Sequence, residues 1–311
     1  MALALPRRHA RTAGAKTGTD LHRRRETRFA WLLILPTILG VGLFTAVPIV
    51  GSFVLSLFNY SIISPTRWVG LANYSALLHD SNAQHAFVVT IILTVGIAIA
   101  QVVVGLALAV AVQRRTGWAR SLYRAAFFVP LLVSGASVSI VMSYIFDSQF
   151  GVLNYYLGLI GLPQVSWLDS TWGAIVTVMI VVTWQQLGFT FIVFSAALGA
   201  VPRELTEAAR VDGAGGWRVF RTITLPMISP SILFTVTVGV INQLQLFDQP
   251  YVLTHGGPGN ATQTVVLDIY EQAFQNLRFG YASAISVILF IVVLVATFLQ
   301  FRISRRWVFY S

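Results

Sequence analysis

Long apolar runs separated by short polar stretches dominate this chain. A helix that crosses a bilayer needs about 20 mainly apolar residues, and six of the runs reach that length. The pattern therefore predicts an all-α integral membrane protein with six transmembrane helices. The expected spans cover residues 29–58, 86–113, 120–146, 172–199, 227–249 and 281–302.

The basic residues are distributed very unevenly among the polar stretches. Of the 21 Lys and Arg residues, all but Arg67 and Arg278 fall on one side of the predicted membrane. Because cytoplasmic loops carry the excess of Lys and Arg, both termini are expected in the cytoplasm. The same charge distribution predicts that residues 1–28 form a disordered basic tail in the cytoplasm. Residues 29–302 would then form the transmembrane domain, and residues 303–311 a cytoplasmic C-terminal tail.

Composition agrees with a membrane protein and excludes several other classes. The chain is 56% hydrophobic and only 10% charged, far below the roughly 25% charged residues of an average soluble domain. The basic residues responsible for the net charge of +10 lie along one membrane face, and this distribution argues against nucleic acid as a partner. The absence of cysteine excludes disulfides and thiolate metal sites.

A charged interval, residues 204–226, separates the fourth and fifth predicted spans. Its first part has good helix formers, and Pro202 suits the first helical turn. Gly213, Gly215 and Gly216 then interrupt the helix before a second short one. We therefore expect two short helices joined by a glycine turn, projecting on the cytoplasmic side.

This interval resembles the EAA loop of bacterial ABC importer permeases. The resemblance implies that the loop at residues 200–226 is a coupling helix, which docks on a separate ATPase dimer that binds ATP and Mg. It also implies a second permease subunit, either a copy or a different chain, and an extracytoplasmic solute-binding protein, in a multi-pass protein of the bacterial inner membrane. The residues that carry it and that would form the ATPase contact are Glu207, Ala208, Ala209, Asp212, Gly213, Ala214, Leu225 and Pro226.

Three later motifs narrow the resemblance to the carbohydrate-uptake branch, the maltose and glycerol-phosphate type. Phe247-Asp248 is the first, and the Thr-x-Gly-Gly-Pro run that begins at Thr254 is the second. The third is Gly-Tyr-Ala-Ser-Ala from Gly280. His255 departs from the glycine that is common at its position.

The sequence shows no recognisable set of catalytic residues and no motif by which the chain could drive transport itself. Its only lysine, Lys16, follows Ala15 rather than the glycine that a phosphate-binding P-loop requires. The five histidines are not paired at helical spacing, so neither a metal nor a cofactor is expected in this chain. The spans hold almost no ionisable groups, which an ion-coupled carrier would need. The chain is therefore expected to be a non-enzymatic pore driven by another subunit.

Polar side chains in the fourth and fifth spans are candidates for the substrate pathway. Placed on one continuous helix, Asn242, Gln245 and Gln249 share a face. Amides and aromatic rings suit sugar hydroxyls without adding charge, but buried amides also commonly link helices, and both readings stay open. Asp248 could instead cap its helix or face the binding protein. The candidates are Trp184, Gln185, Gln186, Asn242, Gln245, Asp248 and Gln249.

Three functional hypotheses remain at this stage. The leading one is a permease subunit of an ABC importer for a sugar or polyol derivative. Neutral saccharides are slightly favoured because the spans carry Arg only near their inner ends, at Arg120, Arg124 and Arg302, and no Lys or Arg farther along the pathway to meet a phosphate. The alternatives are a stand-alone secondary carrier or channel, and a membrane scaffold that only anchors a partner through residues 204–226.

Overall fold

A computed structural model describes residues 17–63, 65–113, 118–305 and 307–308. The expected tail at residues 1–16, the basic residues Arg114 and Arg115 and the end of the C-terminal tail at 309–311 lie outside them. The described chain is mostly helical and divides into two units, one up to Val54 and one from Leu55 onward. Each unit is considered by itself.

The first unit is a single helical path. It differs from the expectation at its start, because residues 17–28 are helical rather than a disordered tail. Phe29–Leu55 is apolar enough to cross a membrane, and none of its side chains is buried. Its elements are α1 (Thr17–Val41), the π-helical turn η1 (Gly42–Ala46) and α2 (Val47–Leu55).

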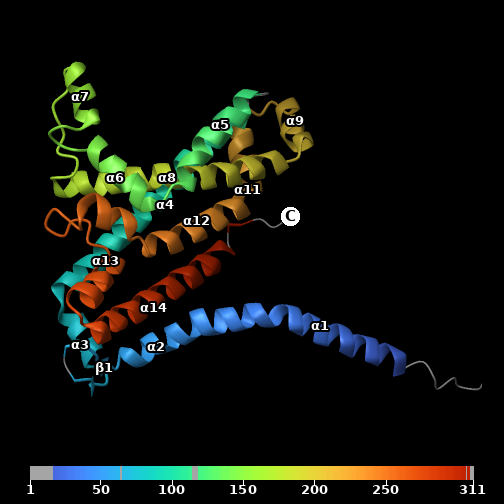
Figure 1. Ribbon diagram of the computed structural model, residues 1–311. Helices are drawn as coiled ribbons and strands as arrows, with labels where there is room; N and C mark the ends of the chain where they lie inside the picture. The colour runs from blue at the N-terminus through green and yellow to red at the C-terminus, as the bar shows by residue number, and fades with distance from the viewer. Residues whose placement is uncertain (1–16, 64, 114–117, 306, 309–311) are drawn as a thin grey trace, which may run out of the picture. The chain divides into compact units, whose positions relative to one another are not determined.

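The second unit is built around α8, whose middle is the most buried of the long helices. α4 packs along both α8 and α12, and α14 packs against α12 and α13 (Figure 1). A two-stranded antiparallel ribbon of β1 (Phe58–Asn59) and β2 (Arg67–Trp68) precedes them. The main helices are α3 (Ala72–His79), α4 (Ser81–Gln113), α5 (Trp118–Phe128), α6 (Gly135–Ile145), α7 (Val152–Leu159), α8 (Thr171–Ala200), α12 (Ser229–Leu244), α13 (Val265–Tyr270) and α14 (Phe279–Ser304).

Close approach between α4 and α8 depends on glycine. A β-carbon at Gly105 would come within 2.8 Å of the Thr190 β-carbon, and one at Gly96 would overlap the Met179 side chain. Small residues let helix backbones come together in a membrane, where packing rather than the hydrophobic effect holds helices in contact. The two helices consequently form one apolar core, which includes Leu93, Ile97 and Val181.

Two of the expected spans are broken rather than continuous. The third is bent by 102° between Leu132 and Gly135, directly after the 3₁₀ turn η2 (Val129–Leu132) that ends its first half. Pro130 lies in this turn, and proline lacks the N–H that a continuous helix would use. The described residues hold four unbroken helices long enough to span a membrane, and up to six spans if each bent pair counts as one.

The other bent pair surrounds the start of α12. Residues 216–227 and α12 meet at 64°. α12 ends at Leu244, so the predicted span 227–249 is wrong at its C-terminal end. From Gln245 the chain turns away and re-forms a π-helical turn, η4 (Pro250–Thr254). A second such turn, η5 (Glu271–Gln275), follows α13.

Candidate functional site

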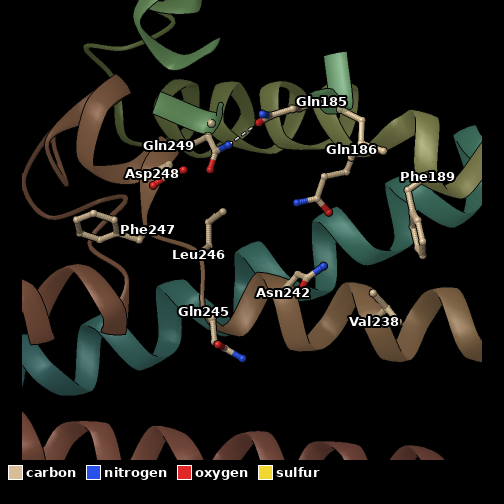
Figure 2. Close-up of a pocket in the computed structure, with 12 residues that line it drawn as sticks. Gln185, Gln186, Phe189, Val238, Asn242, Gln245, Leu246, Phe247, Asp248 and Gln249 are labelled. Carbon is tan, nitrogen blue, oxygen red and sulfur yellow. Dashed lines mark hydrogen bonds between the residues drawn. The ribbon is translucent and has the colours of Figure 1, made fainter. Parts of the chain in front are cut away.

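A cavity of about 430 Å³ lies where α8 and α12 face the bend of the third span. Figure 2 shows amide side chains reaching it from α8, from α12 and from the segment after α12. Its lining residues are Leu131, Gly135, Gln185, Gln186, Phe189, Val238, Asn242, Gln245, Leu246, Phe247, Asp248 and Gln249.

The cavity gathers every predicted pathway residue except Trp184, which does not line it and is 41% exposed. The prediction of a shared helical face for Asn242, Gln245 and Gln249 is wrong, since α12 ends before Gln245. The chain turn after Leu244 brings Gln245 and Gln249 to the cavity by another route. Tertiary folding thus assembles a group that helical periodicity alone would have arranged differently.

Gln185 of α8 forms hydrogen bonds with both the bend of the third span and the segment after α12. Its Nε2 donates to the carbonyl oxygen of Val133, 3.0 Å away, just after the turn η2. Its Oε1 accepts a hydrogen bond from Gln249 Nε2 at 2.7 Å. A backbone carbonyl freed at a helix break needs such a donor inside a membrane. For Gln185 and Gln249, the structure therefore shows the helix-linking role that amides can play.

Gln186 is held by amides from two other helices. Its Oε1 accepts from Gln101 Nε2 of α4 at 2.9 Å and from Gln243 Nε2 of α12 at 3.0 Å. With its oxygen occupied, the Gln186 amide nitrogen is directed into the cavity (Figure 2). Gln101 was not among the sequence candidates. Its position as the one amide in the middle of the apolar run 86–113, whose other amide, Gln113, ends the run, was the available signal.

Asn242 and Asp248 present polar groups to the cavity without a partner among the described residues. Both side chains are exposed, and neither has a side-chain hydrogen bond to another part of the described chain. Asp248 lies against the first residue of α6, where a β-carbon at Gly135 would approach its Oδ2 to 2.5 Å. The positive end of a helix dipole favours a carboxylate there. Only glycine at position 135 leaves room for this arrangement.

The lining has one charge and two aromatic rings. Asp248 is its only ionisable side chain, and no Lys or Arg lines the cavity among the described residues. Phe189 and Phe247 supply flat apolar surface beside the amides. Such a surface can exchange hydrogen bonds with hydroxyl groups and stack on an apolar face. Among all the residues that the structure describes, no group of His, Asp and Glu side chains could hold a metal ion.

The segment after α8 has the local structure that its glycines predict. α9 (Arg203–Val211) ends with Gly213 at φ +83°, a left-handed conformation that suits glycine. Gly213 N donates to the Arg210 carbonyl at 3.0 Å, and Ala214 N donates to the Ala209 carbonyl at 2.9 Å. These are the two hydrogen bonds of a Schellman helix cap. The motif thus makes a rigid corner between α9 and the next helix.

Beyond this corner three short pieces lead to α12. Trp217 stacks on Phe220 with ring centroids 5.6 Å apart, and only Val219 is buried. Val211 is 88% exposed and Trp217 is 73% exposed, which is unusual for large apolar residues on a charged segment. Glu207, Ala208, Asp212 and Gly213 are also exposed. The pieces are α10 (Gly216–Val219), η3 (Phe220–Thr224) and α11 (Leu225–Met227).

Comparison with known proteins gives a consistent result. Residues 101–309 match a family described as the inner membrane component of binding-protein-dependent transport systems. A probable starch degradation products permease of Thermoanaerobacterium thermosulfurigenes is 30% identical over 89% of this chain and 94% of its own length. A multiple sugar-binding transport system permease of Streptococcus mutans is 32% identical over 88% and 94%.

The fold also resembles a solved structure. One chain of a bacterial ABC transporter that imports the acidic polysaccharide alginate superimposes with a TM-score of 0.81. The likeness covers 93% of this chain and 99% of that chain at 23% sequence identity. At this identity the likeness concerns the fold, and the amide cavity has to be judged on its own chemistry.

Proposed function

The chain belongs to the family of inner membrane components of binding-protein-dependent transport systems, and from this premise we propose that it forms half of the membrane pathway of an ATP-driven sugar importer. The observation that carries the proposal is the cavity lined by amides, two phenylalanines and a single carboxylate. A neutral polyhydroxylated solute matches such a lining because it needs hydrogen bonds and stacking but no counter-charge. Relatives named for starch products and multiple sugars support this substrate class.

The solute would cross between this chain and a second permease. Each bent pair would then act as one span, which makes six spans with both termini in the cytoplasm. Asn242, Gln245 and Asp248 line the cavity and are exposed in the described chain, which is consistent with a pathway completed by another subunit. The membrane would be the bacterial inner membrane, as the family description indicates.

Energy would enter through the coupling segment, residues 200–226. Its exposed Val211 and Trp217 provide apolar contact area, and the charged residues around them provide orientation. A partner ATPase dimer with ATP and Mg would hold this segment in a groove. Closure of the ATPase would move the rigid corner at Gly213 and, through α11, the start of α12, while a binding protein delivers the solute outside.

Uptake by the reconstituted assembly tests this proposal. The chain, its second permease, the ATPase subunits and the binding protein are placed in liposomes, and uptake of radiolabelled neutral sugars is followed with and without ATP. We expect uptake only when ATP, hydrolysis-competent ATPase and binding protein are all present. Solute movement by the chain alone without ATP would instead indicate a stand-alone carrier or channel.

A further inference from the structure

A series of aromatic rings leads away from the cavity. Phe247, which lines the cavity, stacks on Tyr251 with centroids 5.1 Å apart and an interplanar angle of 13°. Tyr270 lies 5.3 Å from Phe247 and 5.2 Å from Tyr251. Phe274 follows at 5.4 Å from Tyr270. We call Phe247, Tyr251, Tyr270 and Phe274 the aromatic track.

The aromatic track lies at the surface rather than in a core. Phe247, Tyr251 and Tyr270 are partly exposed, and Phe274 is 64% exposed. None of the four belongs to the buried clusters that hold the helices together among the described residues. A cluster formed only for stability would be expected to bury more of its rings, since burial is what makes aromatic residues stabilising.

The track combines flat apolar surface with hydroxyl groups. Tyr251 and Tyr270 each add a hydroxyl group, and their rings meet edge to face with centroids 5.2 Å apart and an interplanar angle of 64°. A pyranose ring has the complementary character, with C–H groups on its faces and hydroxyls at its rim. Amphipathic aromatic rings are suited to such half-apolar partners.

The two ends of the track and the spacing of its rings fit a ligand of several units. It connects the cavity to η5, which precedes α14 at the end of the unit opposite α9 and α11 (Figure 1). The steps of 5.3 Å from Phe247 to Tyr270 and 5.4 Å from Tyr270 to Phe274 are close to the length of one sugar unit. A single monosaccharide would occupy only one such step.

We propose that the aromatic track binds successive rings of a neutral oligosaccharide, of three or more sugar units, as its leading end enters the amide cavity. This inference rests on the proposed function and specifies its substrate class. Phe247 would stack on the unit at the cavity mouth, and Tyr270 and Phe274 on the units behind it. Shorter sugars would use the cavity without the outer rings.

Uptake as a function of chain length tests the track. The reconstituted assembly is given radiolabelled gluco-, galacto- and xylo-oligosaccharides of one to five units, and the rate at low concentration is compared between wild type, Tyr270→Leu and Phe274→Leu. Leucine keeps apolar volume but removes the flat ring. Because the Phe274 side chain is exposed, Phe274→Leu should not disturb the fold. The control is Phe298→Leu, an equally exposed ring on α14.

We expect each track variant to slow uptake of four- and five-unit sugars by about three- to tenfold, the value of an aromatic contact, and to leave one- and two-unit sugars unchanged. The proposed role of the track would be overturned if uptake fell equally for sugars of every length, or if uptake rates were unchanged at every length. Failure of the variants to assemble with the second permease would overturn it as well. No ATP-driven uptake of any of these sugars by the wild type would overturn the proposed function itself.

Discussion

Gln101 of α4 and Gln186 of α8, 85 positions apart in the sequence, are joined by a hydrogen bond of 2.9 Å from the Gln101 amide nitrogen to the Gln186 side-chain oxygen. Gln243 of α12 donates to the same oxygen at 3.0 Å. One acceptor thus connects three helices at the wall of the cavity. The arrangement fixes which end of the Gln186 amide meets a solute.

Replacement of Gln101 should therefore change recognition without unfolding the chain. In Gln101→Leu, the Gln186 amide loses one of two restraints, and a membrane hydrogen bond of this kind contributes about 0.6–2 kcal/mol. We expect the KM for sugar uptake to rise roughly threefold to tenfold, with little change in the maximal rate. Gln101→Asn, which keeps an amide, should restore part of the affinity. A loss of maximal rate at unchanged KM would contradict this positioning role.

Asn242 should contribute directly to solute binding. Its amide faces the cavity without a hydrogen-bond partner in the described chain, so Asn242→Leu removes a contact to the solute and no helix link. We expect uptake at low sugar concentration to fall about tenfold, the value of one to two hydrogen bonds. Assembly with the ATPase should be unchanged, and Asn276→Leu, outside the cavity, is the control. Failure to assemble would mean that Asn242 is structural.

The corner at Gly213 should be essential for coupling. At φ +83° a proline is excluded, because its ring holds φ near −65°. Gly213→Pro is expected to abolish ATP-driven uptake while the membrane helices remain folded. Gly216→Ala is the matched control, since a β-carbon there meets nothing within 4 Å and φ is not positive. Normal uptake by Gly213→Pro would disprove the coupling assignment.

Asn154 should hold the loop between α6 and α8. Its side chain donates to the carbonyls of Ser148 and Val165 and accepts from Val165 N and Trp167 Nε1, all at 2.9–3.1 Å. Asn154→Ala removes all four bonds, at a cost of about 3 kcal/mol to local order. Hydrogen exchange at Val165 should accelerate about a hundredfold. Gln164→Ala in the same loop should leave it unchanged, and equal acceleration in both variants would contradict the role.

Asp268 should make stability depend on pH. Burial raises its pKa to about 6, and the nearby charges of Asp80 and Glu271 act in the same direction, against the hydrogen bond from Gln272. The folded state holds this proton more tightly than the unfolded state does. The free energy of unfolding therefore falls as pH rises from about 4 to 6, and the whole destabilisation is present above about pH 6. Its Oδ2 has no hydrogen-bond partner among the described residues.

We therefore expect Asp268→Asn to raise the thermal midpoint at pH 7.5 by about 2–4 °C, the response to about 1 kcal/mol in a domain of this size. At pH 3.5, below both the unfolded and the folded pKa of this carboxyl, the two proteins should unfold at nearly the same temperature. The control is Asp147→Asn, because backbone N–H bonds from Phe150 and Gln149 lower the pKa of Asp147. This substitution should not stabilise the protein at pH 7.5. A gain for Asp268→Asn that is the same at both pH values would contradict the titration argument.

Most of the architecture could be read from local patterns. Apolar run length located the long helices, since a membrane leaves the backbone few alternatives to a helix. The glycine at position 213 located the corner of the coupling segment, because few other residues adopt its left-handed conformation. The family resemblance also followed from a local motif, and the match over residues 101–309 confirms it.

The sequence by itself determined the helical membrane class, the family and the polar residues available to line a pathway. Only the tertiary structure decided how these residues are used. Gln185 and Gln186 are adjacent in the chain, yet one holds the broken span at Val133 and the other is held by Gln101 and Gln243. Hydrogen bonds between helices depend on the packing of distant segments, and no periodicity within one segment encodes them. α12 likewise ends at Leu244, and the carbonyl of Leu246 just beyond it accepts a hydrogen bond from Thr264 Oγ1, a residue of the next loop.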